Sequence, residues 1–427
     1  MTDQNQPLTP TEFHTDILLL GGGIAGLYLL KLLNNTGYRC MLIEKDQLGG
    51  GQTLQSQGII HGGLKYALGG NLNAESDAIK EMPDRWRKML NGEETVKLTG
   101  TKVISKTQHM WSTGKFASKF TSFFASKLIR GRIEKLKKDQ MPTIFQSPQF
   151  KGSVYKLTDL VIDTPSLIKD LYQGLEHQIL QGNATAFNEK EGLISATDLT
   201  LNDGQKIRIH HQTVIFSAGA GNQALTELAG IEHAPMQRRP LHMVMVKHDL
   251  PHSLYAHGIG NGSKPRITIT SHATDDGKIV WYLGGEISET GVDRDKADQV
   301  TAAKKELDSL FPWLDFSNAE WSTFFIDRAE PLQQGLTKPD CAYAHAEKNA
   351  IVTWPTKLTL APNLGDRVLE LIEQQGVVKG VVKGVAKGVI TGIEKDEAKD
   401  TDPSAHSDDL TALPHATIAT PKWESLF

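Results

Sequence analysis

Unbroken apolar runs alternate with glycines near the start of the chain. Residues 17–20 and 40–43 are apolar at every position, which is typical of strands buried on both faces of a parallel sheet. Residues 24–33 between them predict a helix. The apolar stretch from 17 to 33 has about the length of a membrane span, but three consecutive glycines and Lys31 interrupt it. The pattern therefore predicts a strand, a turn and a helix.

Gly21, Gly23 and Gly26 join the first strand to the helix with the spacing Gly-x-Gly-x-x-Gly. The first glycine permits a tight turn, the second lets the backbone approach a pyrophosphate, and the third lets the helix pack closely on its strand. Glu44 ends the second strand, where an acid accepts hydrogen bonds from a ribose hydroxyl. This order predicts a dinucleotide site that favours FAD or NAD over NADP. A glycine-rich turn followed by a surface glutamate is the plain alternative.

Later segments extend the pattern. Residues 161–163 predict a strand that leads through a Thr164 cap and Pro165 into a helix over 166–177. Residues 241–246 alternate as a half-buried strand does. Residues 266–270 and 278–283 flank a turn-forming stretch, which predicts a hairpin in an antiparallel sheet.

Length, charge and cysteine content narrow the class of protein. A chain of 427 residues exceeds what one core usually supports, so we expect two domains. Its net charge of -4 argues against a nucleic-acid-binding protein. Cys40 and Cys341 are its only cysteines, which fits a reducing compartment and offers no metal site. The polar start lacks the features of a secretory signal, so we expect a cytoplasmic protein.

A second glycine-rich segment carries a resemblance to a known family. Residues 49–53 read Gly-Gly-Gly-Gln-Thr, and residues 56–66 read Ser-Gln-Gly-Ile-Ile-His-Gly-Gly-Leu-Lys-Tyr. This sequence resembles the D-amino-acid-oxidase-like FAD superfamily, nearest its glycerol-3-phosphate dehydrogenase branch. There, a Ser-x-x-x-Ile-His-Gly-Gly-x-Arg-Tyr segment runs beside the flavin ring, and Lys65 replaces its arginine here. A simple surface loop is the alternative.

Three further segments are similar to parts of that family. Residues 213–222 are an apolar strand that enters a small-residue turn, like the family's second FAD contact; a second dinucleotide motif, for NAD, is the alternative. Residues 327–331 resemble a signature whose arginine, here Arg328, binds the acidic group of the substrate. Residues 355–359 resemble a Gly-Gly-Lys-x-Thr segment, with Pro355 and Thr356 in place of the glycines. A helix N-terminus near Leu364 would stabilise charge on the reduced flavin.

The resemblance implies a discontinuous two-domain architecture. A Rossmann-like α/β domain with a parallel sheet binds FAD and comprises residues 1–75, 152–235 and 326–395. A substrate domain with a mainly antiparallel sheet comprises residues 76–151 and 236–325. We expect a flexible tail over 396–427, preceded by an extended or irregular glycine-rich repeat over 376–392.

Motif and resemblance together predict the site residues. FAD contacts are expected at Gly21, Gly23, Ile24, Ala25, Gly26, Glu44, Lys45, Gln52, Thr53, Ser56, Gln57, Gly58, His61, Gly62, Gly63, Ala218, Gly219, Asn363, Leu364 and Gly365. Candidates for catalysis or substrate binding are His61, His242, Arg328, Lys357, Lys65 and Tyr66. His242 lies on a strand that resembles one where the family directs a histidine at substrate, although a hydrogen-bonded structural histidine is an equal alternative.

Residues 115–138 carry eight basic residues against one acidic residue, a net charge of +7, with phenylalanines interleaved at near-helical spacing. Such a helix could lie peripherally on the inner face of an anionic membrane, where a flavoenzyme could pass electrons to a quinone. A solvated basic helix is the alternative.

The leading functional hypothesis is FAD-dependent oxidation of a small anionic molecule. A C–H bond next to a hydroxyl or an amine would lose hydride to flavin N5, and oxygen or a quinone would accept the electrons. Hydroxy acids, amino acids and polyol phosphates are candidate substrates, although Lys65 weakens the case for glycerol phosphate. The alternatives are a pyridine-nucleotide-dependent flavin reductase and a non-catalytic protein stabilised by FAD.

Overall fold

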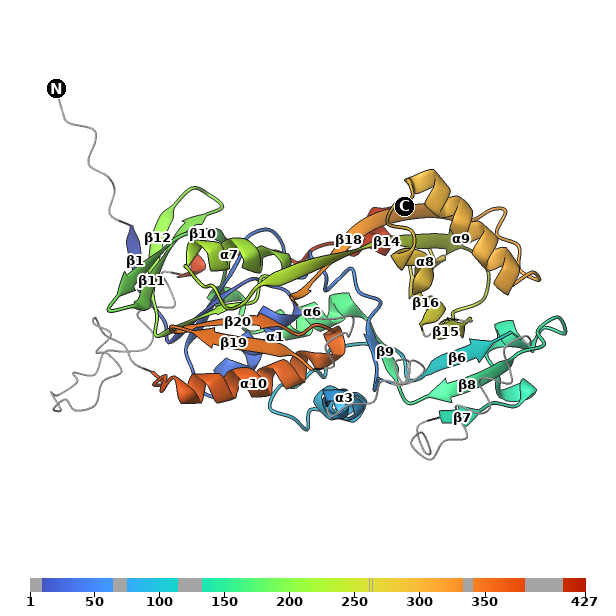
Figure 1. Cartoon of the computed structure of the whole chain (residues 1–427), viewed down its shortest axis with the longest axis horizontal. Helices are drawn as coiled ribbons and strands as arrows, with labels where there is room; N and C mark the ends of the chain where they lie inside the picture. Colours follow the sequence, from blue (N-terminus) through green and yellow to red (C-terminus); the bar gives the residue numbers. More distant parts are fainter. Residues whose placement is uncertain are drawn as a thin grey trace, which may run out of the picture.

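The structure is a computed structural model, which describes residues 10–63, 75–113, 133–260, 262, 264–332, 341–380 and 410–427. Two large sheets dominate the described chain, and they lie side by side in Figure 1. The strands β14 (Met236–His248) and β18 (Glu320–Pro331) run as a long antiparallel ribbon from one region to the other. The α/β class, with a parallel FAD-type sheet and an antiparallel substrate sheet, is confirmed.

The nine-stranded sheet has a parallel centre, antiparallel pairs on both sides of it, and one further parallel pair, β1 with β12, at an edge. Its order is β1 (Thr11–His14), β12 (Lys206–His210), β11 (Leu193–Leu201), β10 (Ile179–Lys190), β3 (Cys40–Glu44), β2 (Ile17–Leu20), β13 (Thr213–Phe216), β20 (Ala350–Trp354) and β19 (Tyr343–Glu347). The strands from β10 to β20 pair in parallel. β2 is apolar throughout because Ile17 and Leu19 face one core while Leu18 and Leu20 face another.

Helices on one face of this sheet share one core. They include α1 (Ile24–Asn35), α10 (Ala361–Gln374) and α6 (Thr164–Tyr172). The predicted helix after 163 is confirmed, but its cap is the Asp163 side chain, which accepts a hydrogen bond from Ser166 N, and the helix ends at Tyr172. Shorter elements are α7 (Asn222–Leu228), η5 (Glu176–Gln178), η6 (Gly219–Gly221) and η7 (Leu358–Leu360).

The eight-stranded sheet is antiparallel except where β15 pairs with β6. Its order is β18, β14, β17 (Ile279–Gly284), β16 (Pro265–Ala273), β15 (Ala256–Ile259), β6 (Gln108–Ser112), β8 (Ser153–Leu157) and β7 (Ile133–Lys135). The predicted hairpin is β16 and β17. The helix α9 (Lys296–Leu310) packs on one face through Ala303 and Leu307, with α8 (Glu286–Glu289) beside it. The short helices η3 (Lys138–Gln140) and η4 (Thr143–Gln146) follow β7.

Residues 75–90 pack with the FAD-type domain, whereas the sequence predicted that residues 76–151 belong to the substrate domain. The helices α3 (Glu75–Lys80) and α4 (Met82–Leu90) lie against the core that α1, α6 and α10 share. Trp86 is buried there, and its indole Nε1 donates to Thr359 O at 2.9 Å. A small sheet of β4 (Ile59–Ile60), β9 (Leu160–Ile162) and β5 (Val103–Ser105) lies next to them.

Residues 410–427 are packed, so the prediction of a flexible tail is wrong for them. His415 bridges to Leu180 on β10, and Leu48 N donates to Thr417 O at 2.8 Å. Beyond them, α12 (Lys422–Ser425) buries Trp423 against the substrate sheet, where its ring stacks on His272 with centroids 3.9 Å apart. This segment therefore crosses from one domain to the other.

Some predicted features lie outside the described residues. They are the basic segment from 115 to 132, the repeat from 381 to 392 and the tail from 396 to 409. Residues 133–135 form β7, not a helix, because they pair with β8. In the part of the chain that is described, no helix is long and apolar enough to cross a bilayer.

Two buried histidines make the stability of this fold depend on pH. Burial lowers the pKa of His211 and of His272 to about 3, whereas a histidine in an unfolded chain titrates near ~6.5. Between these values the unfolded chain binds protons that the folded chain does not. The contribution of the two neutral histidines to the free energy of unfolding is therefore complete above about pH 6.5, and it is lost as the pH falls towards 3.

We expect the free energy of unfolding to drop by about 1.4 kcal/mol per pH unit for each histidine within that window. His272→Phe keeps a ring to stack on Trp423 but cannot bind a proton. Its denaturation midpoint, followed by tryptophan fluorescence, should therefore depend less steeply on pH than that of the wild type. Equal steepness in both proteins would contradict the assignment.

Candidate functional site

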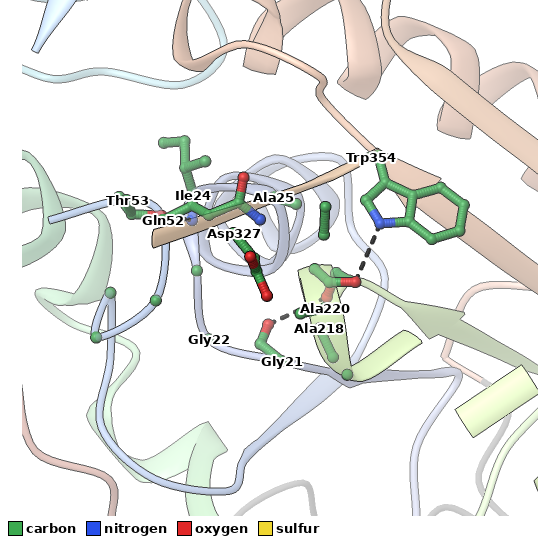
Figure 2. Close-up of a pocket in the computed structure, with 18 of the residues that line it drawn as sticks. Gly21, Gly22, Ile24, Ala25, Gln52, Thr53, Ala218, Ala220, Asp327 and Trp354 are labelled. Carbon is green, nitrogen blue, oxygen red and sulfur yellow. Dashed lines mark hydrogen bonds between the residues drawn. The ribbon is translucent and has the colours of Figure 1, made fainter. Parts of the chain in front are cut away.

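A cavity of about 1170 Å³ lies between the two domains. It exceeds the roughly 300–1,000 Å³ of most small-ligand pockets, so it has room for a dinucleotide and a second small molecule. Its described lining comes from the turn after β2, the loop after β3, part of β10, the turn after β13 with the helix α7, the ribbon of β14 and β18, and the end of β20 with the residues that follow it. Figure 2 shows part of this lining, with the glycine turn and the β13 turn facing each other.

The glycine turn is shaped by close backbone packing. Gly21 has φ +110° and donates its N–H to Ile43 O at 2.8 Å. A Cβ on Gly21 would overlap Ala218 Cα, and one on Gly26 would overlap Gly21 O. A side chain is thus excluded at both positions, and the backbone stays open to a bound diphosphate.

Glu44 and Thr53 hold the residues around the start of α1. Glu44 Oε2 accepts from Gly22 N at 2.5 Å, and Oε1 accepts from Asp46 N at 2.9 Å. Burial raises the pKa of Glu44, and the hydrogen bonds from these amides oppose that rise. Thr53 Oγ1 accepts from Ile24 N at 2.9 Å. The carboxylate stands beside the cavity, where a ribose hydroxyl can reach it.

A network of side chains fixes the turn after β13. Asn222 accepts from Ala218 N at 2.8 Å through Oδ1 and donates to Thr353 O at 3.0 Å through Nδ2. The indole of Trp354 donates to Gly219 O at 3.0 Å, a contact drawn in Figure 2. The second predicted FAD segment is therefore anchored to β20 and held against the first glycine turn.

The loop after β3 is tied to the substrate sheet. Gln57 Nε2 donates to Tyr282 O at 2.8 Å and to Thr268 O at 3.2 Å. Tyr282 OH donates to Gln55 O at 2.5 Å, and burial raises the pKa of Tyr282, so this phenol keeps its proton. The amide nitrogen of Gln57 thus serves the domain contact, while the residue still lines the cavity.

Arg328 and Lys357 are cationic residues of the cavity lining. Arg328 Nη2 lies 3.5 Å from Glu289 Oε1, which fixes one side of its guanidinium. Lys357 follows Thr356, whose φ of +60° is unusual for a β-branched residue. Lys357 N donates to Pro355 O at 2.7 Å and closes a strained γ-turn, and Thr356 Oγ1 donates to Cys341 O at 3.2 Å. This conformation accounts for the family's glycine at that position.

Most of the predicted cofactor residues gather at this cavity. Those that line it are Gly21, Gly23, Ile24, Ala25, Glu44, Lys45, Gln52, Thr53, Ser56, Gln57, Ala218 and Gly219. Lys65 and Tyr66 lie outside the described residues. Within the described chain, no group of three or more potential ligands is arranged to hold a metal ion.

Other predicted contacts have structural partners instead. A Cβ on Gly58 would overlap Ile162 O on β9, and Gly62 N donates to Asp159 Oδ1 at 3.0 Å. A Cβ on Gly365 would lie 2.7 Å from Leu32, so this glycine lets α10 approach α1. Asn363 Oδ1 accepts from Ala342 N at 3.0 Å. None of these residues, nor Gly26, Gly63 and Leu364, is among the described lining.

The helix α10 accounts for part of this difference. It begins at Ala361, three residues before the position that the sequence indicated. The residues that reach the cavity are therefore those before the helix, from Thr353 to Leu358.

The two candidate histidines do not line the cavity. His242 is buried, with Nδ1 at 3.0 Å from Gly291 O and Nε2 at 3.0 Å from Thr323 Oγ1, and its ring stacks on Phe325. Strand alternation directs Leu241 and Met243 to the cavity instead, so the structural alternative describes His242. His61 is also buried, and its carbonyl accepts from Thr359 Oγ1 at 3.3 Å.

Among the charged lining residues that sequence reasoning missed are Arg238 and Asp327, which lie on the β14/β18 ribbon. They come together only because β14 pairs with β18 across the ribbon. No local motif marks either residue as a ligand. Only the pairing register of two strands far apart in sequence would have located them.

Residues 16–343 match the model of the family described as FAD dependent oxidoreductase (DAO). A Pseudomonas aeruginosa protein named probable FAD-dependent oxidoreductase is 44% identical over 421 residues, which cover 98% of this chain and 100% of that protein. The crystal structure of the FAD dependent oxidoreductase from Pseudomonas aeruginosa matches with a TM-score of 0.79 and 38% identity, over 98% of this chain and 100% of that chain.

More distant structures share the fold. Glycine oxidase from Geobacillus kaustophilus has a TM-score of 0.61 at 17% identity, over 90% of this chain and 100% of that one. L-α-glycerophosphate oxidase from Mycoplasma pneumoniae, with FAD bound, has a TM-score of 0.60 at 14% identity, over 84% of this chain and 95% of that one. One component of the anaerobic glycerol-3-phosphate dehydrogenase of Haemophilus influenzae is 33% identical over 71 residues, which are 17% of this chain and 12% of that protein. The resemblance to that branch is therefore weak and local.

The close packing of the glycine turn gives a test of the cofactor site. Gly26→Ala should lower the FAD content of the purified protein by about tenfold or more, because its methyl group pushes α1 away from the turn. Gly262→Ala is the matched control, since a Cβ there stays 3.8 Å or more from its neighbours and Gly262 is not among the described lining of the cavity. The ratio of flavin to protein absorbance measures the outcome. Equal flavin content in the two variants would contradict the assigned role of Gly26.

Proposed function

The chain belongs to the DAO family of FAD-dependent oxidoreductases, and we propose that it oxidises a small anionic molecule at a carbon that bears a hydroxyl or an amino group. The observation that carries this proposal is the position of Arg328. It is a cation in the lining of the cavity, on the strand β18 of the substrate sheet. Guanidinium groups bind carboxylates and phosphates through two parallel hydrogen bonds.

The side chains around Arg328 suit the binding of a short acid. Lys357 adds a second cation to the lining, and Leu241 and Met243 add apolar surface. Glu289 restrains Arg328 from behind and is itself paired with Lys264. An acidic group bound at Arg328 would orient the rest of the substrate, and the apolar surface would exclude water around it.

FAD, when bound, supplies the acceptor for the hydride. The protein contributes binding, orientation and charge. The described lining carries no histidine, so we assign no histidine as the base. His61 and His242 are assigned structural roles, in the loop after β4 and in the substrate sheet.

The finer assignments are also proposals. We propose hydroxy acids and amino acids ahead of polyol phosphates, because Lys65 offers a point charge where the phosphate-specific branch has an arginine. Oxygen or a quinone is proposed as the electron acceptor. A cytoplasmic enzyme that contacts anionic lipid through its basic segment from 115 to 138 would favour the quinone.

Anaerobic bleaching of the flavin tests the reaction. The purified protein should bleach with at least one member of a panel of hydroxy acids, amino acids and glycerol phosphate. Rapid bleaching by NADH alone would instead support a pyridine-nucleotide-dependent reductase. Retention of full colour with every compound would support a non-catalytic role. Adding oxygen or a soluble quinone to the bleached protein then identifies the acceptor.

Arg328→Ala should raise KM for the active substrate by about 10- to 100-fold while the flavin content stays at the wild-type level, because hydrogen bonds to a charged group are worth roughly 1.5–3 kcal/mol. The KM of Arg328→Lys should lie between the KM of the wild type and that of Arg328→Ala. Steady-state kinetics and the visible spectrum measure these effects. An unchanged KM in Arg328→Ala would reject the role of this residue.

A further inference from the structure

An ion pair lies on the β14/β18 ribbon where the ribbon borders the cavity. Arg238 Nη1 is 3.6 Å from Asp327 Oδ2, and both residues line the cavity. The register pairs Arg238 with Ala329 and Asp327 with Pro240, so the two side chains are diagonal neighbours on one face of the ribbon. Each is about half exposed, which leaves both open to a ligand in the cavity.

This ion pair lies over the dinucleotide end of the cavity. Arg238 Nη2 donates to Ala220 O at 3.4 Å, and Ala220 belongs to η6, the turn that packs on the first glycine turn through Ala218. In the view of Figure 2, Asp327 lies between Ala218 and Ala220 on one side and Ile24 and Ala25 on the other. Arg328, the proposed substrate ligand, is the next residue along the strand.

The backbone alone leaves the diphosphate incompletely neutralised. Two of the amides near the start of α1 are already in use, because Gly22 N donates to Glu44 and Ile24 N donates to Thr53. The carboxylate of Asp327 would repel a diphosphate that lies beside the glycine turn. Arg238 offsets that charge and has further donors for phosphate oxygens.

We propose that Arg238 binds the diphosphate of FAD and that Asp327 is a positioning residue, which holds the guanidinium over the glycine turn. The substrate-domain ribbon then holds the cofactor through Arg238 and the substrate through Arg328. The proposal concerns retention of the cofactor and is independent of which molecule is oxidised.

Release of FAD from the holoenzyme tests the proposal. Arg238→Gln should weaken FAD binding by about tenfold, measured as the flavin fluorescence that appears on dilution. Added salt should weaken FAD binding less steeply in this variant than in the wild type, because one charge contact to the phosphates is missing. Arg208→Gln is the matched control, since Arg208 is also a partly exposed arginine in an ion pair, and neither it nor its partner, Asp198 on β11, is among the described lining of the cavity. Equal FAD affinity in the two variants would overturn the proposal.

Competition with two fragments of the cofactor locates the contact. In Arg238→Gln, adenosine should displace FAD at about tenfold lower concentration than in the wild type, because the substitution weakens the binding of FAD but not the binding of adenosine. ADP should displace FAD at an unchanged concentration, because both ligands lose the same diphosphate contact. Parallel shifts for adenosine and ADP would show that Arg238 does not act on the diphosphate.

A second substitution separates the charge effect from a loss of folding. Arg238→Gln leaves the Asp327 carboxylate facing the diphosphate, so Arg238→Gln combined with Asp327→Asn should recover about threefold of the lost affinity. Arg238→Lys keeps the positive charge but loses the planar guanidinium, so its affinity for FAD should lie between that of the wild type and that of Arg238→Gln. If the double variant binds FAD no better than Arg238→Gln, the Asp327 carboxylate does not face the diphosphate, which overturns its place in the proposal. All these readouts are affinities for FAD, so they do not depend on whether the proposed oxidation occurs.

Discussion

The close contact between the turns after β2 and β13 is the constraint on which the rest of the site depends. Parallel pairing of the two strands brings Ala218 so close to Gly21 that no side chain fits between them. Asn222 and Trp354 then hold the β13 turn in place from β20. Because these contacts are backbone to backbone or involve buried side chains, the floor of the cavity is fixed before any ligand arrives. Its charged walls come from elements that are more distant in the chain.

The substrate sheet is coupled to this floor at two places. Gln57 and Tyr282 join the loop after β3 to β16 and β17, and the β14/β18 ribbon carries Arg238 and Arg328 along one edge of the cavity. A shift of the substrate sheet would therefore move the proposed ligands of the cofactor and of the substrate together. The antiparallel sheet is a structural part of the dinucleotide site as well as a cover for it.

Local patterns predicted the parts of the site that lie close together in sequence. The strand, glycine turn, helix and terminal acid from Ile17 to Glu44 could be recognised because each depends on its immediate neighbours. The sequence left both alternatives open for His242, because the face that a strand residue occupies is set by partners such as Thr323 on β18. Arg238 and Asp327 were missed for the same reason. The packing of residues 410–427 was also missed, since a polar composition does not reveal that one tryptophan stacks on a buried histidine.

The crossing segment also has a consequence for the timing of synthesis. Residues 410–427 support the loop after β3, because Leu48 N donates to Thr417 O. Gln47 and Thr417 are also hydrogen bonded, and they are 370 residues apart in sequence. At roughly 5 to 20 residues per second, a ribosome needs about 20 to 70 seconds to reach the second residue after making the first. Throughout that interval the nucleotide loop lacks its outer support. The outer support of this loop is therefore completed only after the residues around Thr417 have been made.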